Sequence, residues 1–388
     1  MVVKLVHIAD LHAGKTNARL LNRNEDLLHS LEQVYTFLKE EKVDFLLIAG
    51  DIFDKKRPDP ESQQLITEFL VKVSQIPTKV ILIGGNHDSA SYLSSFIPWA
   101  NHFGIKIYSA FRKVDFVCPL PEKGIAFVLV PFLSERAITH LEEDSDKAKI
   151  QYAEKIKKVL HYGAQKVKDF PLKVLMAHLY FEGVKIGNTE KEVTVSQAYA
   201  IPQNYIPDIF DYVALGHVHR WQKLEQAPTE TYYTGSLYQL DFGESGQDKY
   251  FNYIRLNPDS YQKVEVEKIK LSLKRKLLKL LWTKEQNESF LSQYKKPDTY
   301  VWVEIEVDTP AEFHLKKHTV ERIFGDNLLK VTMRLKNQKR DFFNTPTKNS
   351  SKLNIYDPVE VYKEYRKRRG KPTNEEILKL LRELMPPS

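Results

Sequence analysis

The chain has 388 residues, of which 42% are hydrophobic and 11% are aromatic, so global disorder is excluded and roughly two or three folded units are expected. Its single cysteine, Cys118, excludes an internal disulfide, and no apolar run approaches the roughly 20 residues that cross a bilayer, so we expect a cytoplasmic protein without a membrane span. The formal net charge of +7 favours a polyanionic partner, although a generally basic solvated surface would explain it equally well.

The first part of the chain alternates short apolar runs with helical patterns, which is typical of an α/β domain. Leu27, Leu31 and Val34 recur at helical spacing between the first two runs, as expected for an amphipathic crossover helix. The later runs lie farther apart, so a second, more antiparallel set of strands is expected to pack on the first. We therefore predict a layered α/β sandwich over residues 1–265. Its predicted strands are VKLVHIA, VDFLLIAG, KVILIGG, IAFVLVPF, KVLMA and DYVALG.

The character of the sequence changes after about residue 265, where a basic stretch begins. Apolar residues then alternate with polar or aromatic ones in residues 300–307 and again in residues 329–336, which predicts two strands. Residues 310–324 between them can form a helix. The pattern predicts a small α+β domain over residues 266–344, with one strongly basic strand face.

The last part of the chain begins with a linker, because residues 345–354 are polar and turn-rich. Asp357 then provides an N-cap for one helix, and Thr373 with Glu376 opens another. We predict a linker and a C-terminal helix-loop-helix over residues 345–388. The apolar stripe of the second helix is too narrow to form a core of its own, so it should dock on a partner or back on its own chain.

Side chains that can bind metal ions follow five of the apolar runs. Ligands in open α/β sheets sit at the carboxyl ends of the strands, so these side chains should meet in one crevice although they are far apart in the sequence. They are Asp10, His12, Asp51, Asn86, His178, His217 and His219.

This set of ligands combines hard oxygen with imidazole nitrogen and contains no thiolate, which suits manganese, iron or zinc. Seven ligands are too many for one ion. We therefore expect two divalent cations roughly 3.5 to 4 Å apart, which would activate a water for in-line displacement at phosphorus. Asp51 is the expected bridging carboxylate.

The elements D-x-H, GDxxD, GNHD and GHxH occur in this order, and together they resemble the motifs of the calcineurin-like metallophosphoesterase superfamily. The resemblance extends from the first strand to His219. It implies a four-layer α-β-β-α sandwich, with two sheets flanked by helices. It assigns one ion to Asp10, His12, Asp51 and His219, and the other ion to Asp51, Asn86, His178 and His217.

His87 does not fit as a ligand in this scheme. It would instead project toward the scissile phosphate, where a protonated imidazole can stabilise charge and donate a proton to the leaving oxygen. Asp54, three residues after the bridging carboxylate, would accept a hydrogen bond from the other ring nitrogen of His87, fixing its tautomer and raising its pKa. We therefore predict His87 and Asp54 as catalytic residues.

Longer stretches resemble the bacterial SbcD nuclease family, the prokaryotic counterpart of the eukaryotic meiotic-recombination repair nuclease. They are VKLVHIADLHAGK, LLIAGDIFDKKRPDPES, GGNHDSASYLSSF, YVALGHVHRWQ and YTGSLYQLDFGE. The resemblance implies a manganese-dependent exonuclease and endonuclease that acts on DNA double-strand ends and single strands in double-strand-break repair. It also implies a homodimer, a nucleoid-associated location, and an SbcC-like coiled-coil ATPase bound through the C-terminal helices.

In this family scheme residues 266–344 form a DNA-contacting capping domain. Lys330, Arg334 and Lys336 lie on its basic strand face and would neutralise backbone phosphates. A solvated basic face is an equally good interpretation of these residues.

Other functions on the same fold stay open, because the core motifs determine the bond class and not the substrate. A phosphoprotein or nucleotide phosphatase or phosphodiesterase shares GDxxD and the histidine pair. Phosphoprotein phosphatases, however, usually continue as GDxxDRG and GNHE, whereas here Lys55 follows Asp54 and the third motif ends in Asp88. A non-catalytic scaffold on this fold would be expected to have lost some of the ligands, all of which are present.

Overall fold

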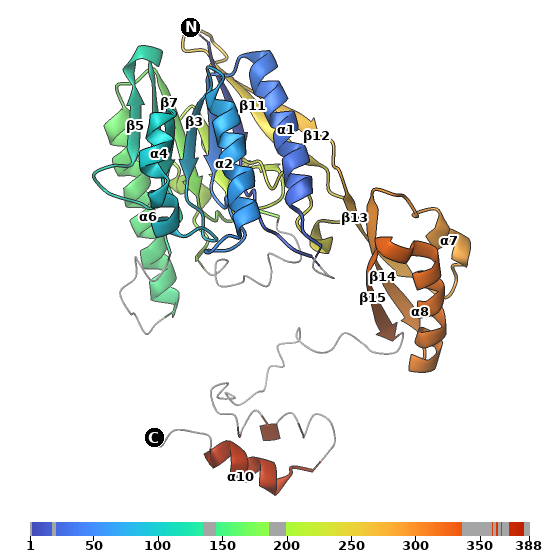
Figure 1. Cartoon of the computed structure of the whole chain (residues 1–388). Coiled ribbons are helices and arrows are strands. Elements are labelled where there is room, and N and C mark those ends of the chain that lie inside the picture. Colours follow the sequence, from blue (N-terminus) through green and yellow to red (C-terminus); the bar gives the residue numbers. More distant parts are fainter. Residues whose placement is uncertain are drawn as a thin grey trace. The chain divides into compact units, whose positions relative to one another are not determined.

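The computed structural model divides the chain into two compact units, Met1–Arg334 and Leu335–Ser388 (Figure 1). It describes residues 2–17, 21–134, 145–185, 199–335 and 372–383, together with residues 359, 362, 363 and 366. No helix in these ranges is both long enough and apolar enough to cross a membrane. The first unit contains three sheets, of which two build the predicted sandwich and the third is smaller.

The first sheet has the strand order β12-β11-β1-β2-β3-β4. Its β1 to β4 run parallel to one another, and β11 pairs antiparallel with β1 and with β12. The strands β1, β2 and β3 of the parallel part come from the first apolar runs of the sequence and are nearly all buried, whereas β4 was not predicted. The strands are β1 (Val3–Ile8), β2 (Phe45–Ala49), β3 (Lys79–Ile83), β4 (Ile105–Tyr108), β11 (Lys249–Leu256) and β12 (Val264–Leu271).

The second sheet has the order β5-β6-β7-β8-β10-β9. Its central strands β6, β7, β8 and β10 are parallel, while β5 and β9 form antiparallel edges. The sheet is therefore less antiparallel than the sequence predicts. The strands are β5 (Val117–Leu120), β6 (Ile125–Val130), β7 (Leu172–His178), β8 (Tyr212–Gly216), β9 (Gln222–Lys223) and β10 (Glu230–Tyr233).

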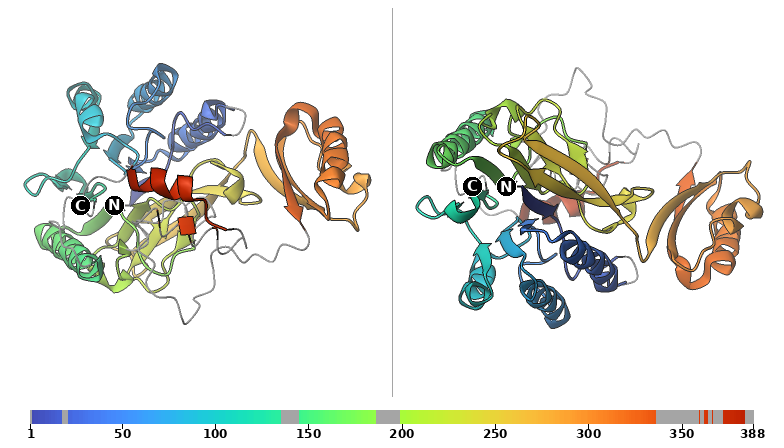
Figure 2. Two further views of the ribbon diagram at one scale, coloured as in Figure 1. Left: turned by 90° about the horizontal axis from the view of Figure 1, so that it is seen from below. Right: turned by 90° about the horizontal axis from the view of Figure 1, so that it is seen from above.

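Each sheet buries one face against the other sheet and one face under helices, as Figures 1 and 2 show. The alternation along β1 is an example: Leu5 packs between the sheets, whereas Val6 packs under the helices. Helices cover the first sheet with residues such as Leu31 and the second sheet with residues such as Leu160. The four-layer α-β-β-α sandwich is thus confirmed. Its helices are α1 (Asn24–Glu41), α2 (Pro60–Ser74), α3 (Ala90–Ser95), α4 (Ile97–His102) and α6 (Ser145–Val167).

The third sheet, in the order β13-β14-β15, lies in the segment predicted as a small α+β domain. Val301, Val303 and Ile305 of β14 are buried and alternate with half-buried residues, as the sequence predicts. The strand β13 was not predicted. The strand β12 runs across the predicted boundary at residue 265. The elements are β13 (Lys276–Trp282), α7 (Glu288–Ser292), β14 (Thr299–Val307), α8 (Pro310–Phe324) and β15 (Leu328–Leu335).

The described part of the second unit contains the helix α10 (Glu375–Glu383). Its first turn is capped by Asn374, whose Oδ1 accepts hydrogen bonds from the backbone N–H groups of Glu376 and Ile377 at 2.9 and 3.4 Å. The predicted cap, Thr373, is one residue too early. Most of the first predicted helix, the linker and Lys336 lie outside the described residues.

Candidate metal centre

The predicted ligands follow strands of both large sheets. Asp10 and His12 come after β1, Asp51 after β2 and Asn86 after β3, all in the first sheet. His178 ends β7, and His217 and His219 follow β8, both in the second sheet. The carboxyl ends of these parallel strands meet at one edge of the sandwich, which is why residues so distant in sequence are neighbours in space.

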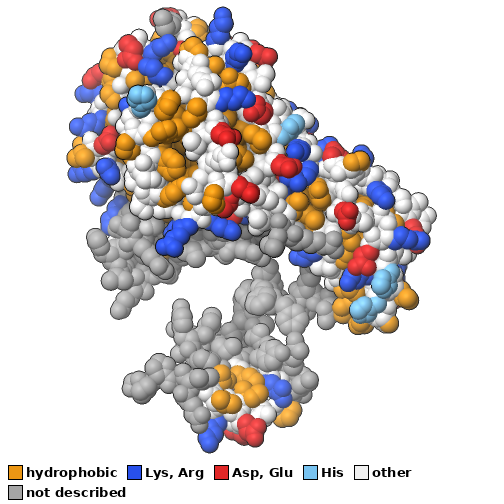
Figure 3. Space-filling model, in the orientation of Figure 1, with side chains coloured by type: hydrophobic (Ala, Val, Ile, Leu, Met, Phe, Trp, Pro, Cys, Tyr) orange, Lys and Arg blue, Asp and Glu red, His pale blue; other side chains and the backbone are white. Residues whose placement is uncertain are grey.

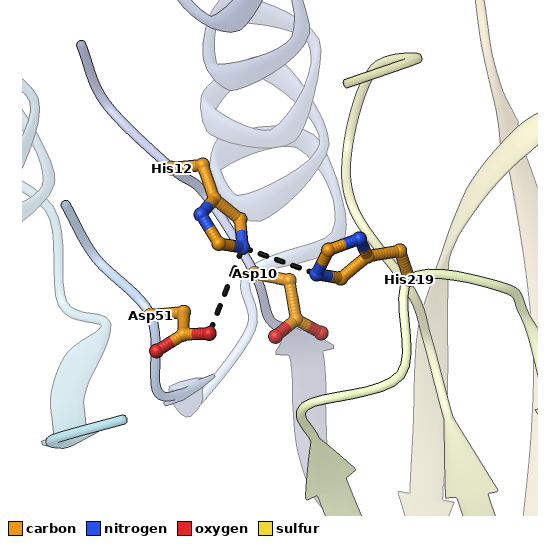
Figure 4. A group of neighbouring side chains, drawn as sticks. All are labelled: Asp10, His12, Asp51 and His219. Atoms are coloured by element: carbon orange, nitrogen blue, oxygen red, sulfur yellow. Dashed lines mark hydrogen bonds and ion pairs between the residues drawn. The ribbon is translucent and has the colours of Figure 1, made fainter. Parts of the chain in front are cut away.

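The first group of ligands brings together Asp10, His12, Asp51 and His219, whose ligand atoms all lie within 4.8 Å of one another. His12 Nε2 lies 3.2 Å from His219 Nε2 and 3.6 Å from Asp51 Oδ2 (Figure 4). Two imidazole nitrogens and a carboxylate oxygen directed at a common point are the donors that a borderline divalent cation prefers.

The second group contains Asp51, His178 and His217, whose ligand atoms lie within the same distance of one another. Asn86 Oδ1 completes it, at 2.9 Å from His178 Nε2 and 2.8 Å from His217 Nδ1. Asp51 Oδ2 is 3.4 Å from His178 Nε2. Since the same oxygen faces His12 in the first group, Asp51 lies where a bridging carboxylate must lie.

Both aspartates have one oxygen fixed by the backbone and the other directed into the centre. Asp51 Oδ1 accepts from the N–H of His87 at 2.9 Å, which leaves Oδ2 for the two groups. Asp10 Oδ1 accepts from the N–H of His217 at 2.9 Å, and its Oδ2 is buried without a hydrogen-bond partner among the described residues. A buried oxygen in this state fits a cation, because it is otherwise costly.

The backbone is strained at the predicted ligands. Asp10, His12, Asp51 and His217 have φ of 54°, 45°, 52° and 101°, and Lys42 is the one other residue with positive φ, apart from glycines, in the described chain. Such conformations cost side-chain-bearing residues about 1–3 kcal/mol each and collect at functional sites. Strain of this kind fits a functional role for these positions rather than a contribution to stability.

Glycines let the strand ends and loops at this edge of the sandwich approach closely. A Cβ on Gly216 would overlap the carbonyl oxygen of Ala49, and a Cβ on Gly85 would overlap the carboxylate and backbone of Asp51. The glycines of the GDxxD, GGNHD and GHVH motifs are therefore needed for contact between loops.

Burial sets the protonation of the centre. It lowers the pKa of His12 to about 4 and that of His217 to about 3, so both rings are neutral and can bind a cation through a lone pair. Burial also raises the pKa of Asp10 to about 6. For His178, burial lowers the pKa but the charge of Asp51 raises it more, to about 9. The charge of Asp51 thus favours the protonated form of His178.

Asp54 does not hold His87 in the way that the sequence suggested. His87 Nδ1 donates to the backbone carbonyl of Asp54 at 2.9 Å, whereas the Asp54 carboxylate lies 3.3 Å from His12 Nδ1 and 3.1 Å from Lys15 Nζ. Burial raises the pKa of this carboxyl, but the hydrogen bond with His12 and the charge of Lys15 lower it more, well below its usual range. The predicted hydrogen bond from His87 to the Asp54 carboxylate is therefore wrong. The Asp54 side chain points instead toward the segment after β1, which carries His12 and Lys15.

His87 itself lies beside the ligand groups. Its ring packs edge-on against that of His12, with 4.7 Å between centroids. His12, Asp54 and His87 also have ligand atoms within 4.8 Å of one another, but Asp54 is already paired with Lys15. The position suits a proton donor next to the centre.

Two residues that the sequence did not single out contact the predicted ligands. Glu244 Oε1 lies 3.3 Å from His219 Nδ1, and the ring of Phe132 stacks on His217 at 6.1 Å between centroids. Glu244 ends the stretch YTGSLYQLDFGE, and Phe132 ends the run IAFVLVPF. The sequence analysis looked for metal-binding side chains at the ends of predicted strands. Phe132 was missed because its side chain has no ligand atom, and Glu244 was missed because it follows no apolar run.

The predicted DNA-contacting face carries both signs of charge. Lys330 Nζ lies 4.0 Å from the ring centroid of Trp302, as does Lys279 Nζ. Arg334 Nε lies 3.9 Å from Glu306 Oε2, so its charge is partly offset. The face is therefore less strongly basic than its strand pattern suggests, because the neighbouring strand β14 contributes acidic residues.

Comparisons with known proteins point to one family. A model described as calcineurin-like phosphoesterase matches residues 3–221. The structure is similar to a dimetal phosphatase from Danio rerio, with 14% identity, 70% of this chain and 99% of that chain covered, and a TM-score of 0.40. It is also similar to the purple acid phosphatase PPD1 from yellow lupin (Lupinus luteus), with 16% identity, 69% of this chain and 52% of that chain covered, and a TM-score of 0.41.

Proposed function

Because the chain belongs to the calcineurin-like phosphoesterase family, we propose that it is a two-metal-dependent DNA exonuclease and endonuclease, the nuclease subunit of an SbcCD-type repair complex acting on double-strand ends. The observation that carries the two-metal part of the proposal is the position of Asp51 Oδ2, which lies 3.6 Å from His12 Nε2 and 3.4 Å from His178 Nε2. One carboxylate oxygen shared by two ligand groups is what a two-metal phosphoesterase requires.

Two divalent cations, for which we propose manganese, would activate a water and offset negative charge at phosphorus. Asp10, His12, Asp51 and His219 would hold one of them. Asp51, Asn86, His178 and His217 would hold the other. His178 Nδ1 donates to the carbonyl of Ala49 at 2.8 Å, which leaves Nε2 as the ligand atom.

His87 is the residue that we propose for proton transfer. A carbonyl oxygen can only accept, so Nδ1 of His87 carries a hydrogen and donates it to Asp54. Nε2 is then the nitrogen that would face substrate, and its protonated form would donate to the leaving oxygen.

A cavity of about 510 Å³ beside the second ligand group supports a substrate larger than a phosphate group. Asn86 of that group lines it, together with Lys56, Ser109, Phe111 and Phe132. Cavities of this size take small ligands, and aromatic rings with a nearby lysine suit a nucleobase and its phosphate.

The partners are proposals of the same kind. Lys279 and Lys330 beside Trp302 support a contact between the third sheet and the DNA backbone. Hydrophobic side chains gather on the face of the first unit that carries α1, α2 and α4 (Figure 3). This face supports a homodimer.

In α10, Ile377 and Leu380 are 40% and 55% exposed, which supports docking of an SbcC-like ATPase.

A phosphoprotein or nucleotide phosphatase or phosphodiesterase is the rival that the metal centre fits equally well. Incubation of the protein with Mn²⁺ and end-labelled duplex DNA, beside phosphopeptide and cyclic nucleotide controls, separates these functions. We expect DNA cleavage that requires the metal, with little turnover of the controls. Turnover of the phosphopeptide without DNA cleavage would contradict the proposal, and inactivity on every substrate would favour a scaffold.

A further inference from the structure

The carboxylate of Glu244 lies next to the ring of His219, on the side away from the first ligand group. The Nε2 of His219 faces His12 in the first ligand group, at 3.2 Å, while its Nδ1 lies 3.3 Å from Glu244 Oε1 on the opposite side of the ring. Glu244 is only 2% exposed. The imidazole therefore lies between the first ligand group and a buried carboxylate.

The other oxygen of Glu244 is fully engaged. Glu244 Oε2 pairs with Lys249 Nζ at 2.6 Å and accepts from the N–H of Leu240 at 3.0 Å and from Ser236 Oγ at 3.3 Å. Oε1 has no hydrogen-bond partner among the described residues and lies 3.3 Å from His219 Nδ1. The carboxylate is thus anchored through one oxygen, and the second oxygen is left for His219.

Lys249 joins this carboxylate to the backbone of the ligand. It is 2% exposed, and its Nζ donates to Ser236 Oγ at 2.8 Å and to the carbonyl oxygen of His219 at 3.1 Å, in addition to its ion pair with Glu244. Burying two charges far from water adds little stability by itself. Their placement against one predicted ligand indicates a task at that ligand.

The segment that carries Glu244 is also tied to the third sheet. Gln239 Nε2 donates to the carbonyl of Glu244 at 3.1 Å, and Gln239 Oε1 accepts from the N–H of Leu277 in β13 at 2.6 Å. Ser245 Oγ accepts from the N–H of Lys279 at 2.9 Å. Glu244 is therefore held in place by contacts that do not depend on a cation.

A similar arrangement recurs at the other imidazole of the first group. His12 Nδ1 lies 3.3 Å from the Asp54 carboxylate, which pairs with Lys15 at 3.1 Å. In the second group, by contrast, His178 Nδ1 donates to the neutral carbonyl of Ala49. A carboxylate paired with a lysine thus stands behind both histidines of the first group.

We propose that Glu244 is the positioning residue for His219: it accepts the Nδ1 hydrogen, so that Nε2 keeps its lone pair and faces the first cation. Lys249 holds Glu244 in this orientation. The inference rests on the two-metal centre of the proposed function. Carboxylates in this position orient a ligand histidine and raise its basicity, and their loss typically weakens metal binding about 10–100-fold.

The test compares two double variants of the full chain that leave no buried charge unpaired. Glu244→Leu with Lys249→Met removes the acceptor, whereas Glu244→Gln with Lys249→Met keeps an oxygen that can accept from Nδ1. Binding of Mn²⁺ alone is measured by titration calorimetry, and thermal unfolding in EDTA reports whether each variant folds. We expect the first variant to bind one of two ions about 10–100-fold more weakly, and the second to recover most of that loss.

Equal Mn²⁺ affinity of both variants, either at the wild-type level or equally weakened, would overturn the role of Glu244 as acceptor. If the Glu244→Leu variant loses its fold in EDTA, Glu244→Met with Lys249→Met replaces it as the variant without an acceptor, and the same difference in Mn²⁺ affinity from the Gln variant is expected. Because the readout is metal binding, a wild-type chain that binds two ions but does not cut DNA would contradict the proposed function and leave this inference standing.

Discussion

Several residues of the candidate metal centre lower the stability of the fold in order to direct their side chains into the centre. Asp10, Asp51 and His217 keep a left-handed backbone, and the two carboxylates are buried, where charge is costly. A chain selected only for a stable fold would place glycine or an apolar residue at these positions. Bound cations would offset the free-energy cost of the strained backbone and the buried charges. Removal of metal should therefore loosen this edge of the sandwich.

His87→Ala separates metal binding from proton transfer. His87 lies outside both ligand groups, so the variant should still bind two Mn²⁺ ions, while cleavage of duplex DNA should fall by about 10²–10⁴-fold with the loss of general acid catalysis. Metal content is measured by elemental analysis and cleavage with end-labelled DNA. His161→Ala, on the exposed face of α6, is the matched control. Undiminished cleavage by His87→Ala would remove His87 from the mechanism.

His7 should make stability depend on pH. Burial lowers its pKa from 6.5 to about 3, so below pH 6.5 the unfolded chain takes up a proton that the folded chain refuses, and folding weakens as pH falls toward 3. Between pH 7.5 and pH 5.5 the free energy of unfolding should fall by about 1.4 kcal/mol more in wild type than in His7→Gln. Urea titrations in EDTA measure this difference, and parallel pH profiles would contradict it.

Spacing in the sequence could predict that the candidate ligands meet in space, but not which residues support them. Asp10, Asp51 and His178 follow strands, and the end of a strand is visible in a single sequence. Asp54 contacts His12 because its side chain turns toward one neighbouring loop and not the other. Glu244 contacts His219 from a turn that has no strand pattern in the sequence. Such contacts depend on tertiary packing, which the sequence pattern does not contain.

At the scale of elements, the ends of β2 and β8 are in contact because Gly216 has no side chain. Gly216→Ala would place a methyl group on the carbonyl of Ala49 and against the ring of His178, so the strand ends must separate. We expect a lower thermal unfolding temperature and weakened Mn²⁺ binding. Gly246→Ala, at φ +76°, meets no atom within 4 Å, so any loss in that variant comes from backbone strain and not from a steric overlap. Wild-type metal binding in Gly216→Ala would contradict the close packing of these strand ends.

The elements themselves were predicted unevenly. The buried strands β1, β2 and β3 were recognised from continuous apolar runs, and β14 from its strict alternation. The strand β13 was missed because in KLLKLLW pairs of apolar residues are separated by lysine, which fits a helix as well as a strand. Its pairing with β14 decides between the two, and that pairing joins distant residues.

At the scale of the whole molecule, the predicted task of the C-terminal segment can be tested by deletion. Every predicted metal ligand lies in the unit Met1–Arg334, whereas α10 lies in the unit Leu335–Ser388. Removal of residues 352–388 should therefore abolish association with an SbcC-like ATPase and spare metal-dependent cleavage. Co-purification and the DNA assay measure the two properties. Unchanged association would mean that the ATPase binds elsewhere.

The central claim is that both large sheets together hold two cations around Asp51. Crystals grown with Mn²⁺ and measured at the manganese absorption edge test it directly. We predict two anomalous peaks roughly 3.5–4 Å apart, with the Asp51 carboxylate between them, Asp10 and His219 at one peak, and Asn86 and His217 at the other. A single peak, or peaks away from Asp51, would contradict the account.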